Sequence, residues 1–251
     1  MKFQLLSIVK RILSPIKNAV VEEFQYRFLG KTGFGNNLLR LRKFRVYHKK
    51  LRSNPKDPIL YLTLDVEWGQ NPYFAQMLDA LKDRKVCAYM FVLAEGMEDN
   101  ANLLRRILEE GHCVGNHTMN HPNLTQCSQT QVLKELTDCQ NIFQELTGQK
   151  MPKVLRPPFG RINRPLAKLL YKNGYTVMHW SLHVPDYGKE QPVWEDYKKY
   201  LTERVHNGGI ILQHSFSSAT AENLGNIIDL CRGMGYRFAE KEDFDALLSN
   251  G

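Results

Sequence analysis

The chain has 251 residues, of which 43% are hydrophobic and 24% charged, and this is the size of one large globular domain or two small ones. Such a composition excludes a disordered or fibrous protein. The formal net charge of +8 is concentrated at one end, because residues 1–58 hold 14 basic and 3 acidic residues and the remainder holds 20 and 23. The slightly acidic remainder need not act on a polyanion, and we expect no nucleic-acid partner.

The N-terminal segment has an amphipathic pattern. Between residues 3 and 28, apolar residues recur at helical spacing, with Lys10, Arg11 and Lys17 between them and a break or kink expected at Pro15. One interpretation is a basic amphipathic helix on an anionic membrane surface. The other is a helical extension that packs on the following domain.

Three features bear on the location of the protein. The first apolar run ends at Lys10 without a small-residue cleavage site, so we do not expect a cleaved signal peptide. No apolar run approaches the roughly 18 residues of a transmembrane helix. The cysteines are odd in number and match no zinc-finger or CxxC spacing, so we expect buried thiols in a reducing environment. They are Cys87, Cys113, Cys127, Cys139 and Cys231. Together these features favour the cytoplasm or the cytosolic face of a membrane.

The stretch Ser53–Pro58 has the composition of a linker, and we predict a basic, mainly helical extension over residues 1–57 and a domain over 58–251. In the domain, short β-like runs alternate with longer helix-like runs, which favours a parallel α/β barrel or open sheet. The predicted strands are Ile59–Val66, Val86–Val92, Val154–Arg156, Thr176–Trp180 and Gly209–Gln213. The predicted helices are Phe74–Leu81, Ala101–Glu110, Gln129–Leu146, Arg164–Tyr171 and Ala221–Met234.

Two carboxylates stand at the end of the first predicted strand, in the segment YLTLDVEW. Asp65 and Glu67 are two residues apart, and side chains at this spacing project from the same face of a strand. Polar residues at the carboxyl ends of parallel strands usually form the active site of such folds. We therefore expect both carboxylates to converge there, although acids at strand ends also cap loops.

Two histidines follow in the segment GNHTMNHP. His117 and His121 are four residues apart, so on one helical turn both imidazoles would lie on one side. A pair of imidazoles completed by a carboxylate and open to water suits a divalent metal, usually zinc.

Three further segments place polar groups after predicted strands. In LRPPFG, two prolines stiffen the turn after Arg156, so that the arginine can face a carboxylate and a backbone N–H can face an oxyanion. The segment HWSLHVPDY ends in Asp186, and LQH ends in His214. A rigid surface turn and a buried structural histidine are the alternatives.

In this order and spacing, the segments YLTLD, GNHTMNHPNLT, LRPPFG and GGIILQHSF resemble the polysaccharide deacetylase family. These are the NodB-homology enzymes of carbohydrate esterase family 4, and the resemblance extends to their muramic acid deacetylase branch. It covers residues 58–248 and implies a distorted (β/α) barrel.

The resemblance implies a role for each residue of these segments. Asp65 would be the catalytic base, oriented by Arg156, and His214 the general acid, paired with Asp186. His117 and His121 would bind a divalent metal, zinc in the first place, with cobalt, nickel or manganese as alternatives. The Phe159 amide would contribute to an oxyanion hole. Trp180 and Leu212 would shape a pocket for an acetyl methyl group.

Two residues depart from the family's pattern. The usual adjacent pair of aspartates is here Asp65–Val66, so the second metal-binding carboxylate is missing from its place. Glu67, on the same face as Asp65, is the nearest substitute and the third ligand we expect. A site of two histidines and additional waters is the alternative. Tyr187 replaces the usual tryptophan after Asp186.

Three functions follow as hypotheses. The first is metal-dependent hydrolysis of the N-acetyl group of an amino sugar in a polysaccharide, either peptidoglycan or a chitin-like glycan. The second keeps this site but acts on a lipid-linked amino sugar at the cytosolic membrane face. The third, suggested by Val66, is a catalytically inactive glycan-binding homologue.

Overall fold

A computed structural model describes residues 44, 46–47, 54–68, 72–183, 186 and 192–249. The predicted amphipathic segment 3–28, its kink at Pro15 and its membrane contact lie outside these residues. Residues 44–251 form one compact unit. Two residues of the predicted extension, strand β1 (Val46–Tyr47), pair with strand β6 (Thr176–Met178) of this unit. The division of the chain at residue 57 remains a prediction.

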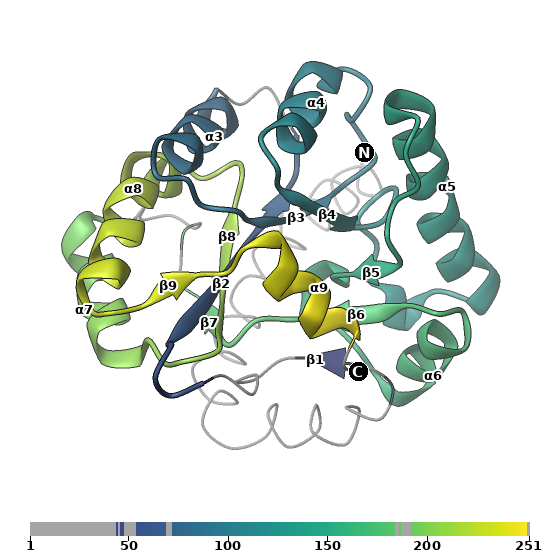
Figure 1. The fold of residues 1–251 in the computed structure, drawn as a ribbon. Coiled ribbons are helices and arrows are strands. Elements are labelled where there is room, and N and C mark those ends of the chain that lie inside the picture. The colour runs from purple at the N-terminus through teal and green to yellow at the C-terminus, as the bar shows by residue number, and fades with distance from the viewer. Residues whose placement is uncertain are drawn as a thin grey trace, which may run out of the picture. The chain divides into compact units, whose positions relative to one another are not determined.

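A curled parallel sheet forms the centre of the domain (Figure 1). The strands are β1, β2 (Ile59–Val66), β3 (Tyr89–Val92), β4 (Cys113–Asn116), β5 (Val154–Leu155), β6 (Thr176–Met178), β7 (Leu182–His183), β8 (Gly209–His214) and β9 (Arg237–Phe238). Their order is β1-β6-β5-β4-β3-β2-β8-β7, with β9 also paired to β2. Because β1 and β7 end the path of the described strands, the sheet is a half-barrel, which confirms the predicted fold class.

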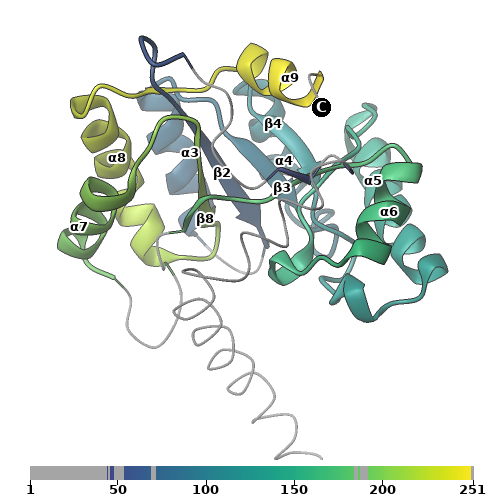
Figure 2. The ribbon, with the colours of Figure 1, turned by 90° about the horizontal axis from the view of Figure 1, so that it is seen from below.

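Helices surround the outer face of this sheet, with α7 and α8 on one side and α5 and α6 on the other (Figures 1 and 2). The helices are α3 (Tyr73–Asp83), α4 (Ala101–Glu109), α5 (Gln129–Thr147), α6 (Arg164–Lys172), α7 (Trp194–Arg204), α8 (Ser218–Gly233) and α9 (Lys241–Ser249). Two short 3-10 turns, η2 (Leu124–Gln126) and η3 (Pro158–Gly160), interrupt the connecting loops. No helix in the described part of the chain is both long and apolar enough to cross a bilayer.

Strand β2 shows how the sequence positions the site. Its eight residues are all buried, as expected for a parallel strand covered on both faces. Alternate residues, such as Leu62 and Leu64, pack with the helices in the main hydrophobic core. The others project to the opposite face, where Thr63 is followed by Asp65 at the end of the strand.

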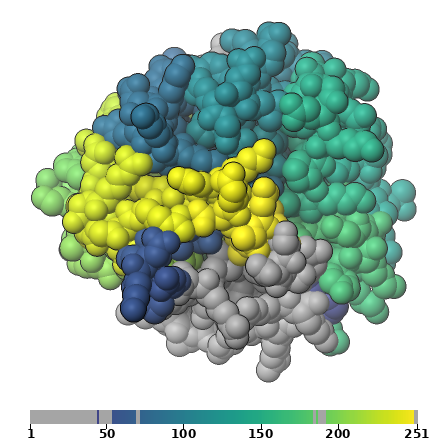
Figure 3. Space-filling model, in the orientation of Figure 1, coloured from purple at the N-terminus to yellow at the C-terminus, as the bar shows by residue number. Residues whose placement is uncertain are grey.

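Helix α9 packs at the amino ends of the strands. The ring of Phe244 contacts Tyr61 of β2 and Tyr89 of β3 edge-on, with centroids 5.4 and 5.3 Å apart. In Figure 2, β2 runs away from α9. In Figure 3 the C-terminal segment, in yellow, crosses the middle of the face that is seen. The carboxyl ends of β2 and β8, where Asp65 and His214 stand, therefore point away from α9.

Most predicted elements are present, with limited shifts of their ends. β2 has the predicted bounds, whereas β3 begins at Tyr89 rather than Val86, and α8 begins three residues earlier than predicted, at Ser218. The pattern did not predict β4, β7, β9, α7 or α9. All five cysteine thiols are free, and three of them, Cys113, Cys139 and Cys231, are buried.

Candidate functional site

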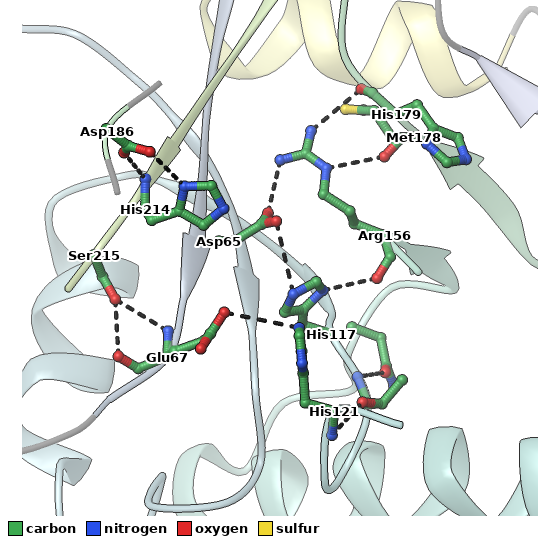
Figure 4. A network of polar contacts seen from close by, with 12 residues as sticks. Asp65, Glu67, His117, His121, Arg156, Met178, His179, Asp186, His214 and Ser215 are labelled. Atoms are coloured by element: carbon green, nitrogen blue, oxygen red, sulfur yellow. Dashed lines mark hydrogen bonds and ion pairs between the residues drawn. The ribbon is translucent and has the colours of Figure 1, made fainter. Parts of the chain in front are cut away.

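Asp65 and Arg156 form a buried ion pair at the carboxyl end of β2 (Figure 4). Arg156 Nη1 donates to Asp65 Oδ1 at 2.8 Å, and the guanidinium also donates to the carbonyl oxygens of Met178 and His179. Its Cζ lies 4.1 Å from the centre of the Phe91 ring. Since the arginine is fully buried and held on three sides, its orientation toward Asp65 is fixed.

The positive charge of Arg156 keeps Asp65 ionised. Burial alone would raise the pKa of the Asp65 carboxyl, but the positive charge of Arg156, followed by His117 and His214, outweighs it and lowers the pKa below its ordinary value. Asp65 is therefore a carboxylate at neutral pH, which is the form that can accept a proton.

Glu67, His117 and His121 lie together beside Asp65. One ligand atom from each of the three lies within 4.8 Å of the other two. His121 Nε2 lies 3.7 Å from Glu67 Oε1, and His117 Nε2 lies 3.7 Å from Asp65 Oδ2. The cluster thus joins a carboxylate that follows β2 to two imidazoles that follow β4.

The local structure around His121 differs from the expected helical turn. After β4 the chain forms a loop in which Thr118 and His121 have φ angles of 77° and 53°. Polar side chains accept hydrogen bonds from the backbone N–H groups of this loop. Asn116 Oδ1 accepts the N–H of Thr118, and Thr118 Oγ1 accepts that of His121. Pro122, next in the chain, also disfavours a helix at His121. These contacts hold the loop in the conformation that brings the two imidazoles together.

A residue on α5 supports the same loop. Glu135 Oε2 accepts the backbone N–H groups of Met119 and Asn120 at 3.0 and 2.9 Å. Its other oxygen accepts from the Asn120 side chain at 3.0 Å. No local pattern in the sequence marks Glu135, which lies sixteen residues after Met119 in the chain.

The donor set fits a divalent cation. His117 Nδ1 lies 2.8 Å from the carbonyl oxygen of Arg156, so the N–H is directed to that oxygen and Nε2 faces the cluster, an arrangement usual for metal-binding histidines. Burial is the largest cause that lowers the pKa of His121, to about 4, which keeps its imidazole neutral. Glu67, His117 and His121 could therefore hold a divalent metal ion and leave positions open.

Across the site from Arg156, Asp186 orients His214 (Figure 4). Asp186 Oδ1 lies 2.8 Å from His214 Nδ1, and Oδ2 accepts the backbone N–H of His214 at 2.7 Å. Burial lowers the pKa of His214, but the charges of Asp186, Asp65 and Glu67 outweigh this and raise it above its ordinary value. The protonated imidazole can therefore serve as a proton donor.

His183 adjoins this pair, and its ring centroid lies 6.2 Å from that of His214. His183, Asp186 and His214 also bring ligand atoms within 4.8 Å of one another. However, both oxygens of Asp186 already accept hydrogen bonds from His214. Within this group, Asp186 and His214 are therefore already joined as a hydrogen-bonded pair.

The turn η3 lies beside the histidines. Phe159 has a left-handed conformation, with a φ angle of 58°, and its ring contacts that of His121 at a centroid distance of 4.6 Å. Trp180 packs against Gly160, where a Cβ atom would lie 2.6 Å from the Trp180 ring. Leu212 is buried on β8, two residues before His214 and thus on its side of the strand.

Ser215 is another supporting residue that was not among the predicted site residues. Its hydroxyl accepts the N–H of Glu67 and donates to the carbonyl of Glu67, both at 3.0 Å. The residue after β2 is thereby tied to the end of β8. The position of Ser215 directly after His214 is the one sequence signal that could have suggested it.

Comparison with known proteins identifies the family. The profile described as Polysaccharide deacetylase matches residues 52–178. The chain is 31% identical over 191 residues to the peptidoglycan-N-acetylmuramic acid deacetylase PdaA of Bacillus subtilis, covering 76% of this chain and 72% of that protein. The solved structure of PdaA, a family 4 carbohydrate esterase, superposes with a TM-score of 0.76 at 29% identity, covering 85% and 89%.

A family 4 pseudoenzyme from Bacillus anthracis also superposes, with a TM-score of 0.70 at 25% identity, and covers 81% of this chain and 68% of that one. Inactive relatives therefore share this fold. The identity to PdaA and the matching profile establish the family. The chain belongs to the polysaccharide deacetylase family, the family 4 carbohydrate esterases, and is a hydrolase of that class.

Proposed function

We propose that this protein removes the N-acetyl group from an amino sugar of peptidoglycan or a chitin-like glycan, using a metal ion held by Glu67, His117 and His121. The observation that carries the proposal is the placement of an ionised carboxylate, Asp65, and an oriented imidazole, His214, at the ends of adjacent strands beside this cluster. Hydrolysis of an amide needs both a base and an acid.

Two side chains of the protein each transfer one proton in this reaction. Asp65, held as a carboxylate by Arg156, accepts a proton from the attacking water. His214, held by Asp186, donates a proton to the departing sugar amine. The backbone N–H of Phe159, in the rigid turn after two prolines, donates to the oxyanion, and the loss of such a donor typically costs roughly 100-fold to 1000-fold in rate.

A divalent ion bound to Glu67 and the two histidines would polarise the amide carbonyl and lower the pKa of water at the site. Two imidazoles and a carboxylate with open positions favour zinc, and cobalt, nickel or manganese also suit such ligands. Val66 occupies the position of the family's second aspartate, and Glu67 supplies the carboxylate in its place. Val66 is fully buried in the core beneath the helices and offers no ligand.

The acetyl group would lie against apolar side chains. Leu212 is buried on the side of β8 that carries His214, and Trp180 packs over the η3 turn. These two residues are our candidates for the wall that contacts the acetyl methyl group. The name of PdaA supports peptidoglycan as the glycan, with N-acetylmuramic acid as one sugar to test.

Acetate release from peptidoglycan fragments and chitooligosaccharides tests the proposal. We expect the wild-type protein to release acetate, and the Asp65→Asn and His214→Ala variants to fold but to lose at least about 100-fold in rate, the usual contribution of acid–base groups. Asp229→Asn, an exposed residue paired with Arg84, is the control. Full activity in either site variant would contradict the assignment.

Because a pseudoenzyme relative shares this fold, an inactive glycan-binding protein is the second candidate function. It predicts that the wild-type protein binds these glycans without releasing acetate. A lipid-linked amino sugar is the third substrate to include. Acetate released from that substrate alone would move the assignment from a polysaccharide to a lipid-linked sugar.

A further inference from the structure

Thr220, in the first turn of α8, lies against the Asp186–His214 pair. Its backbone N–H donates to the Oγ of the N-cap residue Ser217 at 3.0 Å, which fixes Thr220 in the turn. Its own Oγ1 lies 2.8 Å from Asp186 Oδ2 and 2.9 Å from Gln213 Oε1. Thr220 and Gln213 are fully buried, so these contacts form away from water.

The hydroxyl carries one proton and can donate to only one of the two oxygens. An ionised carboxylate is a stronger acceptor than an amide oxygen, so the proton of Thr220 belongs on Asp186. The partial positive charge at the N-terminus of α8 favours the same negative charge. Gln213, whose Nε2 donates to the carbonyl of Leu212 at 2.7 Å, is the competing acceptor.

The bond from Thr220 differs from the other two bonds to Asp186. Both of those come from His214, one from its ring and one from its backbone N–H. They join the carboxylate to the imidazole but do not tie the pair to the surrounding helices. Thr220 adds a bond from α8, whose first turn is itself fixed by Ser217.

We propose that Thr220 is a positioning residue for the general acid, because its hydroxyl holds the Asp186 carboxylate so that Oδ1 stays on the Nδ1–H of His214. The inference rests on the proposed role of His214 as the proton donor. Thr220 itself does not contact the substrate. Its effect passes through Asp186 to the direction of His214 Nε2.

Two substrates with different leaving groups test this role. An amide nitrogen must be protonated to leave, whereas an aryl acetate releases a stabilised phenolate with little help from an acid. For Thr220→Val we expect acetate release from an N-acetylated oligosaccharide to fall about tenfold, equivalent to about 1.4 kcal/mol. The fall should be in kcat rather than KM, and aryl acetate hydrolysis should stay within about twofold.

Thr63→Val is the matched control. Thr63 is also a fully buried threonine whose hydroxyl donates one hydrogen bond, in this case to the carbonyl of Ile211 on β8. Its bond does not involve the Asp186–His214 pair, so the ratio of the two activities should not change. Thr220→Ser keeps the hydroxyl and should restore the ratio. If the valine variant does not fold, Thr220→Ala replaces it.

A second measurement does not depend on turnover. In protein labelled with ¹⁵N-histidine, NMR follows the exchange of the His214 Nδ1–H proton with water. We expect exchange at least about tenfold faster in the Thr220 variant and unchanged in Thr63→Val, because a buried bond protects its proton. Parallel losses on both substrates, no loss on either, or unchanged exchange would overturn the proposal. A wild-type protein that releases no acetate would count against the proposed function, while the exchange measurement still decides the role of Thr220.

Discussion

Asp65 and His214 are direct partners in the register of β2 and β8, the two adjacent strands at the centre of the site. Each stands at or next to the last residue of its strand, and a separate side chain orients each one: Arg156 orients Asp65 and Asp186 orients His214. Figure 4 shows the two supports on opposite sides of the pair. The proposed base and the proposed acid are thus held at one level of the half-barrel, beside the cluster of Glu67, His117 and His121.

Replacement of Arg156 should destabilise the protein. Arg156→Gln leaves Asp65 buried without its partner, and removal of one member of a buried pair typically costs about 3–5 kcal/mol. Chemical denaturation measures this change in the free energy of unfolding. Arg84→Gln, which breaks the exposed pair with Asp229, is the control and should cost at most about 1 kcal/mol. Equal losses in the two variants would contradict the buried pair.

The pH dependence of kcat/KM should follow from Asp65 and His214. The pKa of Asp65 is lowered, so the base remains ionised into the acidic range, and activity should persist there. The pKa of His214 is raised, so activity should fall only as the pH rises through that value and the acid loses its proton.

Asp186→Asn tests the second half of this profile. Burial lowers the pKa of His214, and the charge of Asp186 is the largest effect that opposes it. Without that charge the pKa of His214 should fall, and the alkaline limb of the profile should move to lower pH. A titration of kcat/KM in Asp186→Asn and in the control Asp229→Asn measures the shift. If the alkaline limb does not move, Asp186 does not control the pKa of the proton donor, and the prediction is wrong.

Gly160 should tolerate no side chain. It has a φ angle of 60°, and a Cβ atom would lie 2.6 Å from the Trp180 ring, so Gly160→Ala should displace the η3 turn that carries the Phe159 amide. We expect a loss of about 1–3 kcal/mol in stability from overpacking, with reduced acetate release. Gly148→Ala is matched in φ, at 70°, but its Cβ would meet no atom within 4 Å. Equal effects in the two variants would assign the loss to backbone strain alone.

Glu135 should affect metal affinity without contacting the metal. Glu135→Ala leaves the N–H groups of Met119 and Asn120 without their acceptor, so the loop before His121 should loosen. Loss of such a supporting contact typically lowers metal affinity about 10-fold to 100-fold. Calorimetric titration with zinc measures this. Asp138→Ala, on the same helix, should bind zinc like the wild-type protein.

The sequence predicted the parallel α/β architecture because its long apolar strands and amphipathic helices alternate clearly. Helices α7 and α9 were missed because they are rich in charged residues, and α7 buries only Tyr197 and Leu201. The turn at His117 was predicted as helical from spacing alone, whereas Thr118, Asn116 and Glu135 determine its loop conformation.

The candidate site was predictable where residues stand at or just after the carboxyl ends of strands, as Asp65, Glu67 and His214 do. Thr220 was not, because it is an ordinary residue in the first turn of a helix and its contact with Asp186 joins residues 34 positions apart in the chain. Ser215 and Glu135 belong to the same class. Their hydrogen bonds join distant parts of the chain, and no local pattern in the sequence marks them.

The most direct test of the proposed function measures bound metal and acetate release in the same samples of wild-type protein and Glu67→Ala. Metal-stripped protein is reconstituted with zinc or cobalt and given peptidoglycan fragments. We expect one metal ion per wild-type chain and metal-dependent acetate release, and a loss of both in Glu67→Ala but not in the exposed control Glu95→Ala. Wild-type protein that binds no metal, or that binds it and releases no acetate, would contradict the proposed function.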